Sequence, residues 1–255
     1  MRNGVDEVCG CFPTGRHYPG IAEDIADVIV RVEGLMHELT ATHVWLEQPF
    51  AVIDFETTGL DHQNDRVLEM AIVWFRGGVV EKAQNWLINP TIPVPEESRK
   101  VHGIGDEELR GAPTFAEVAD EIEQLLDGRI PVAYNAEFDR RFLHAEFSRL
   151  KRGPAEHLVP ALRPSVTWID PLVWVREFQK YEKGKKLTDV VARMGITLEK
   201  AHRAAGDAEA AGRVLLGLAD KMPKSYGELV RLQMQYGARQ EAELQQWRKR
   251  RSETP

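Results

Sequence analysis

The spacing of apolar residues changes character three times along the 255-residue chain. Residues 1–20 are rich in Gly and Pro without periodicity, which predicts a loop. Between Ile21 and Leu39, apolar residues recur every three or four positions with acidic residues between them, which predicts an amphipathic helix. After residue 222, a thinner apolar stripe predicts a weaker C-terminal helix, because Gly237 interrupts a Gln-rich segment that ends in basic residues 248–251.

Strand-length apolar runs alternate with helical patterns between these two ends. The predicted strands cover residues 51–54, 67–75, 79–88, 130–134 and 166–169, with Gly77-Gly78 as a hairpin turn. The predicted helices cover residues 115–127, 136–150, 171–181, 187–194 and 204–221, the first capped by Thr114. This order predicts an α/β fold in which helices flank a mixed five-stranded sheet. We expect a domain at residues 49–222, with helical extensions at residues 1–48 and 223–255.

Composition and charge exclude several classes of protein. With 43% hydrophobic and 29% charged residues, the chain is expected to form a soluble globular protein. No apolar run has the length of a membrane span and no basic leader precedes one, so we expect a cytoplasmic protein without membrane contact. Cys9 and Cys11 are interpreted as reduced thiols, since a zinc site would need further ligands. A net charge of -7 argues against a simple cationic nucleic-acid clamp.

The first predicted strand ends in the sequence Asp54-Phe55-Glu56. Side chains two residues apart on a strand point to the same face, so these two carboxylates should lie close together. Neighbouring anions repel each other unless a cation lies between them. The segment alone fits a metal site and solvated acids at a strand end equally well.

Two further acidic positions follow a strand or a loop. Asp139 falls in the first turn of the helix after the fourth strand, where an acid can also act as a simple helix cap. His202 precedes Asp207, which opens a helix of small residues, and this pair fits either an acid-base pair or an ordinary exposed His. Three carboxylate positions and a His at element ends together indicate a two-metal phosphoryl-transfer site.

These motifs resemble those of a known family. Asp54-x-Glu56, Asn135-x-x-x-Asp139 and His202-x-x-x-x-Asp207 are similar to the three exonuclease motifs of the DEDDh (DnaQ-like) 3′-5′ exonucleases. The resemblance spans residues 49–222 and includes the segments 101–104 and 112–115, which are similar to epsilon-like members. It implies an RNase H-like fold and release of nucleoside monophosphates from 3′ ends.

The resemblance also implies roles for individual residues. Asp54, Glu56, Asp139 and Asp207 would bind two Mg²⁺ or Mn²⁺ ions, and His202 would take the proton from the attacking water. The substrate-binding residues implied by position are Thr57, Thr58, Leu60, His102, Tyr134 and Asn135. The threonines also fit a purely turn-shaping role, and Tyr134 stands where epsilon-like members commonly have His. Asp170 is interpreted as a cap for the helix that starts at Pro171.

The nature of the substrate rests on weaker observations. The 101–104 segment favours single-stranded or frayed DNA, whereas an RNA-directed exonuclease of the RNase T or oligoribonuclease type is the main alternative. The others are a polymerase-accessory binding module and a Mg²⁺-dependent endonuclease or transferase of the same fold, although the latter would lack the His202–Asp207 pairing. The terminal helices suggest docking to a polymerase or other protein, or else a cover for exposed edges of the domain.

The charge is unevenly distributed along the chain. Residues 1–139 hold 26 acidic and 10 basic residues, whereas residues 140–203 hold 14 basic and 7 acidic residues. The second segment includes Lys180, Lys183, Lys185 and Lys186, which we interpret as a phosphate-facing side or an ordinary solvated face. The acidic balance therefore does not argue against an enzyme that binds a strand end through metals.

Overall fold

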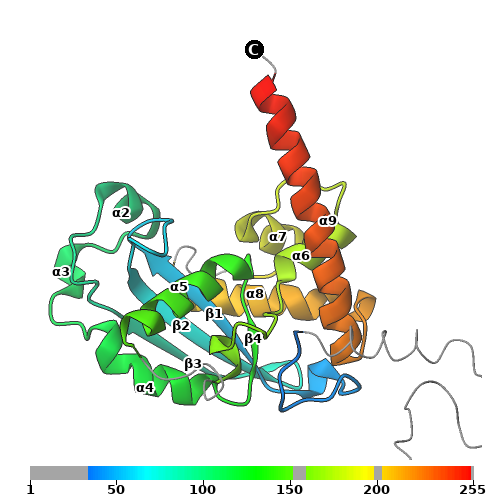
Figure 1. The fold of residues 1–255 in the computed structure, drawn as a ribbon, viewed down its shortest axis with the longest axis horizontal. Coiled ribbons are helices and arrows are strands. Elements are labelled where there is room, and N and C mark those ends of the chain that lie inside the picture. The colour runs from blue at the N-terminus through cyan, green and yellow to red at the C-terminus, as the bar shows by residue number, and fades with distance from the viewer. Residues whose placement is uncertain (1–33, 152–158, 198–202, 254–255) are drawn as a thin grey trace, which may run out of the picture.

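The computed structural model describes residues 34–151, 159–197 and 203–253 (Figure 1). Its sheet consists of β1 (Phe50–Thr57), β2 (Val67–Arg76), β3 (Val79–Leu87) and β4 (Ile130–Val132). The strand order is β3-β2-β1-β4, in which β4 is parallel to β1 and the other pairs are antiparallel. The mixed sheet predicted from the sequence is therefore confirmed.

Helices and short 3₁₀ turns make up the rest of the regular structure in the described residues. The helices are α2 (Glu96–His102), α3 (Asp106–Leu109), α4 (Phe115–Leu126), α5 (Ala136–Arg149), α6 (Pro171–Phe178), α7 (Leu187–Met194), α8 (Ala204–Leu218) and α9 (Tyr226–Glu253). Short 3₁₀ turns occur at Trp45–Glu47, Pro160–Leu162 and Ala219–Lys221. Within the described residues, no helix is both long and apolar enough to cross a membrane.

Helices cover both faces of the sheet. Alternate residues of β1 point to opposite sides, so that Val52 packs into a core with α8, while Ile53 packs into a second core with α4 and α5. Figure 1 shows α8 and α5 on either side of β1. This arrangement brings the start of α8 and the start of α5 toward the end of the central strand β1.

The predicted fifth strand is wrong in its extent. Residues 166–169 are buried apart from Thr167, but they pair with the sheet only through one parallel bridge, between Val132 and Ile169. The sheet therefore has four strands among the described residues. A short apolar run indicates burial and does not by itself indicate regular strand pairing.

The predicted N-terminal helix lies mostly outside the described residues. Its last part, residues 34–39, forms turns rather than a helix, although Leu35 and Met36 are buried in the core beside α8. The apolar periodicity correctly marked residues that contact the core, but over this stretch Gly34 has a left-handed backbone (φ +78°) that a regular helix does not contain. Cys9 and Cys11 also lie outside the described residues.

The C-terminal helix is longer and more regular than its sequence suggested. It runs without interruption through Gly237, and its first turns contribute Tyr226, Leu229 and Val230 to the core. Its second half is largely exposed and extends away from the rest of the molecule (Figure 1). The two halves of α9 therefore have different roles, since only the first is part of the packed body.

Candidate active site

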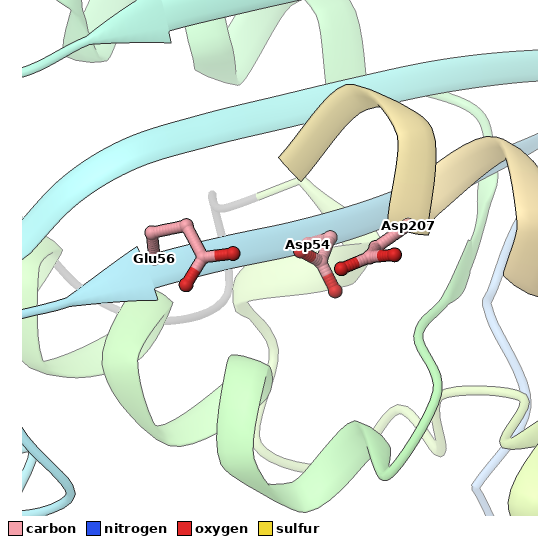
Figure 2. Close-up of side chains that lie close together, drawn as sticks. All are labelled: Asp54, Glu56 and Asp207. Atoms are coloured by element: carbon pink, nitrogen blue, oxygen red, sulfur yellow. The ribbon is translucent and has the colours of Figure 1, made fainter. Parts of the chain in front are cut away.

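Two carboxylates project from the same side of β1. Asp54 and Glu56 are separated by the buried Phe55, which points to the opposite face and packs with α4 and α5. Figure 2 shows both carboxylates beside the first turn of α8, with Glu56 nearer the end of the strand. The pleat of the strand therefore produces the pair that the sequence predicted.

Asp207 completes a group of three carboxylates. It lies in the first turn of α8, and one carboxylate oxygen from each of Asp54, Glu56 and Asp207 lies within 4.8 Å of the others. Figure 2 shows the carboxylates of Asp54 and Asp207 pointing toward each other. Since hard divalent cations prefer several carboxylate oxygens at such spacing, this group has the composition of a cation site.

Asp139 is a fourth carboxylate beside this group. It is buried in the first turn of α5, and its charge helps to raise the pKa of Asp54. The pKa of Asp139 itself is well above its usual range because the side chain is buried. Two helix starts and one strand thus contribute all four acidic residues to one region.

The electrostatics of the acidic group fit a bound cation. Burial raises the pKa of Asp54, and the nearby charges of Asp139, Asp207 and Glu56 raise it further. Burial, followed by the charges of Asp207 and Glu69, raises the pKa of Glu56 to about 7. Carboxylates that are costly to ionise together become favourable ligands when a divalent cation neutralises them. The residues present therefore fit a divalent metal.

An ion pair between the partly exposed Arg203 and the buried Glu69 fixes the start of α8. Arg203 precedes the helix, and its Nη2 donates to Glu69 Oε1 on β2 at 2.8 Å, while the backbone N–H of Ala204 donates to Glu69 Oε2 at 3.2 Å. Glu69 is 1% exposed, and it also accepts a hydrogen bond from the Asn85 side chain. Sequence reasoning missed this pair, although one charged residue inside the apolar run 67–75 was a signal for it.

Two threonine hydroxyls at the end of β1 form hydrogen bonds within the turn that follows. Thr57 Oγ1 donates to the Gly59 carbonyl at 2.6 Å, and Thr58 Oγ1 donates to Asp65 Oδ1 at 3.0 Å. Both hydroxyls thus hold the turn, which supports the interpretation that Thr57 and Thr58 shape it. Leu60 is 86% exposed at the tip of this turn, so its apolar side chain is free to meet a ligand.

The segment before α5 is held by Asp170. Asn135 has a left-handed backbone (φ 68°, ψ 50°), which Asn tolerates better than most residues. The backbone N–H groups of Asn135 and Ala136 each donate to the Asp170 carboxylate at 3.0 Å, and Leu172 N–H donates to it at 2.8 Å. Asp170 caps α6, as predicted, and also fixes the start of α5.

Tyr134 and His102 both have structural partners. The Tyr134 hydroxyl donates to the Lys185 carbonyl at 2.5 Å, so this group binds the protein rather than pointing into open space. His102 is buried at the end of α2, where its Nδ1 accepts the Ile104 N–H at 3.0 Å and burial lowers its pKa. The contacts of both residues with a substrate stay predictions.

His202 lies outside the described residues, so its predicted role as a base also stays a prediction. Its neighbour Arg203 belongs to the ion pair described above, and Asp207 follows one turn later. The described part of the site therefore consists of the four carboxylates and the groups that orient them.

Comparison with known proteins places this geometry in context. Residues 51–215 match the sequence profile of the RNase_T family, described as exonuclease. The chain is 32% identical over 160 residues to DNA polymerase III subunit epsilon of Treponema pallidum, covering 62% of this chain and 71% of that protein. It is 31% identical over 199 residues to the PolC-type DNA polymerase III of Thermotoga maritima, covering 78% of this chain but only 14% of that much longer protein.

Solved structures of exonucleases share the fold. Exonuclease X in complex with 5′ overhanging duplex DNA superimposes with a TM-score of 0.55 at 20% identity, covering 72% of this chain and 99% of the other. The nuclease domain of 3′hExo, a DEDDh family member bound to rAMP, gives a TM-score of 0.57 at 16% identity, with coverage of 70% and 95%. These likenesses support the RNase H-like exonuclease fold expected from the sequence.

Proposed function

Since the chain belongs to the RNase_T exonuclease family, we propose that it removes nucleotides from the 3′ ends of single-stranded or frayed DNA in a metal-dependent reaction. The observation that carries this proposal is the group formed by Asp54, Glu56 and Asp207, with Asp139 beside it. A mere scaffold has no need for buried carboxylates that repel each other.

The acidic residues would hold two divalent cations, Mg²⁺ or Mn²⁺. Figure 2 shows Asp54 and Asp207 facing each other, with Glu56 further along β1. Asp139 adds a fourth carboxylate from the first turn of α5. Such cations acidify an attacking water and neutralise charge on the scissile phosphate. The protein contributes the fixed positions of its ligands, which the Glu69–Arg203 pair and the Asp170 hydrogen bonds maintain.

The remaining roles belong to side chains around the acidic group. His202 would take the proton from the attacking water, and the leaving 3′ oxygen would depart on the opposite side of the phosphorus. Leu60, at 86% exposed, would contact the terminal base. Asn135, on its left-handed backbone before α5, is exposed and would contact the terminal nucleotide.

The names of the sequence relatives support DNA as the substrate, since they are subunits or forms of DNA polymerase III. The solved neighbours include Escherichia coli exonuclease I with single-stranded DNA and 3′hExo with rAMP, so they support nucleic-acid 3′ ends in general. The names of the relatives also support a polymerase as a partner. We propose that the second half of α9 provides docking surface for it, since residues 241–251 are exposed apart from the partly buried Leu244.

A labelled oligonucleotide assay tests the proposed activity. A 5′-labelled single strand incubated with the protein and Mg²⁺ should yield a ladder that shortens from the 3′ end, and EDTA should abolish it. Asp207→Asn should also abolish it, whereas Asp220→Asn, an exposed acid after α8, should not. Internal cuts alone, or no products, would contradict the proposal.

Running matched DNA and RNA strands in the same assay distinguishes the two substrate classes. We expect faster shortening of DNA. Faster shortening of RNA would instead support the exoribonuclease alternative. For the partner, mixing the protein with a polymerase III catalytic subunit should give a complex on size-exclusion chromatography, and removal of residues 241–255 should abolish the complex but not the ladder.

A further inference from the structure

The connection between α6 and α7 presents cations and an aromatic ring to solvent. Residues 180–186 contain four lysines and a single acid, Glu182. Tyr181, in the same connection, is 89% exposed, the highest value for a large apolar side chain within the part of the chain that the structure describes. Exposed aromatic rings among lysines are typical of surfaces that bind single-stranded nucleic acid.

Internal hydrogen bonds hold this connection in shape. Lys185 Nζ donates to the carbonyls of Gln179 and Glu182, both at 2.5 Å. Arg193 of α7 donates to the Gly184 carbonyl at 2.8 Å. Since these cations bind backbone carbonyls, the loop is ordered before any ligand arrives, which lowers the entropic cost of binding.

The remaining lysines are oriented differently from Lys185. Lys180, Lys183 and Lys186 are exposed, whereas Lys185 is only partly so. Lys180 Nζ lies 5.0 Å from the centre of the Tyr181 ring. With 89% of the residue exposed, the ring still has surface available for stacking beside this cation. Three lysines and an aromatic ring are thus available to a ligand on one short connection.

A hydrogen bond joins this connection to the candidate active site. The Tyr134 hydroxyl donates to the Lys185 carbonyl at 2.5 Å, and Tyr134 directly precedes the segment that Asp170 fixes at the start of α5. That helix carries Asp139 in its first turn. The connection and the acidic group are therefore attached to the same short stretch of chain.

We propose that residues 180–186 form a platform for single-stranded nucleic acid behind the terminal nucleotide, with Tyr181 stacking on a base and Lys180, Lys183 and Lys186 contacting phosphates. The platform rests on the proposed function and adds to that function a second contact between the protein and the same strand. The chemistry is that of a base face and a phosphate backbone, which DNA and RNA share.

Strand binding in EDTA tests the platform without catalysis. Fluorescence anisotropy with labelled dT16 and U16 should show that Tyr181→Ala weakens binding about tenfold, because the variant loses the stacking of one base on the ring. Tyr181→Phe should bind like the parent protein, since it keeps the ring. Replacing Lys180, Lys183 and Lys186 with Gln should reduce the salt dependence of binding by about two units of slope, at ~0.7 per phosphate contact.

A matched control and a short substrate separate this proposal from the proposed function. Lys221→Gln combined with Lys224→Gln removes two exposed lysines outside residues 180–186. This double change should alter strand affinity and the salt dependence of binding less than the triple lysine change does. Hydrolysis of the p-nitrophenyl ester of thymidine 5′-monophosphate, which occupies only the cleavage position, should be unaffected by Tyr181→Ala. Unchanged strand binding with normal ester hydrolysis would overturn the platform. Weakened binding in a protein that hydrolyses nothing would overturn the proposed function alone.

Discussion

Asp170 and Gln233 are joined by a hydrogen bond in which the backbone N–H of Asp170 donates to Gln233 Oε1 at 2.8 Å. Gln233 lies on α9 and is 5% exposed. Its Oε1 also accepts the Trp174 indole N–H at 3.1 Å, and its Nε2 donates to the Trp168 carbonyl at 2.7 Å. Because Asp170 fixes the start of α5, this one side chain connects the C-terminal helix to the segment that carries Asp139.

Replacing Gln233 by Leu should destabilise the protein by about 3 kcal/mol. The change leaves several buried backbone and indole groups without partners, and each such group costs roughly 1–3 kcal/mol. Urea unfolding measures the effect. Gln245→Leu provides the control, because Gln245 is exposed and donates to Glu241 on the same helix, and it should change stability by less than about 0.5 kcal/mol. Equal effects would contradict the connecting role of Gln233.

The Glu69–Arg203 pair predicts a rescue experiment. Arg203→Met should lower the unfolding free energy by about 2–3 kcal/mol, because it leaves a buried carboxylate unpaired; the 38% exposure of the arginine side chain keeps the loss below that of a fully buried pair. Adding Glu69→Gln should recover part of this loss, since the amide carries no charge, although its single oxygen replaces only one of the two carboxylate oxygens that accept from Asn85 and Ala204. If adding Glu69→Gln lowered the unfolding free energy further, the unpaired charge of Glu69 would not be the cause of the loss in Arg203→Met.

Local patterns in the sequence account for much of the site. The strand period places Asp54 and Glu56 on one face, and the starts of two predicted helices place Asp139 and Asp207. These features depend on residues close together in the sequence, so the rules for apolar periodicity and helix capping predict them.

Contacts between distant segments could not be predicted from the sequence. Glu69 and Arg203 are separated by 134 positions, and Gln233 lies 63 residues from Asp170, so no local spacing relates either pair. The short helix α2 (Glu96–His102) was also missed, because it has almost no apolar periodicity and only His102 is buried. These features depend on how elements pack, which single-sequence patterns do not encode.

Metal binding should strengthen as the pH rises from 5.5 to 8. The folded protein without metal holds the Glu56 pKa at about 7, above the ordinary value of 4.5. The stabilising effect of its protonated form is therefore complete below pH 4.5 and is lost as the pH rises through 7. A cation competes with this proton, so the increase in melting temperature caused by Mg²⁺ should be small at pH 5.5 and larger at pH 8.

Differential scanning fluorimetry with Mg²⁺ or EDTA at each pH measures this dependence. Glu56→Gln should reduce the pH dependence of stability in EDTA, because the amide does not titrate, while the raised pKa values of Asp54 and Asp139 keep the rest of it. Asp61→Asn, at an exposed acid in the following loop, should leave the Mg²⁺ effect unchanged. A Mg²⁺ effect of equal size at both pH values would argue against cation binding by these buried carboxylates.

Replacing His202 by Ala should slow hydrolysis by about two to four powers of ten, since a general base typically contributes a factor of that size. The carboxylates remain in place, so Mg²⁺ should still raise the melting temperature as in the parent protein. The matched control is His37→Ala, an exposed histidine in the turns before β1, which should leave turnover unchanged. Turnover of His202→Ala at saturating Mg²⁺ should also lose the part of the acidic limb that His202 contributes, whereas the part caused by proton competition at the carboxylates should stay. A variant that loses Mg²⁺ binding together with turnover would show that His202 acts on the metal site instead.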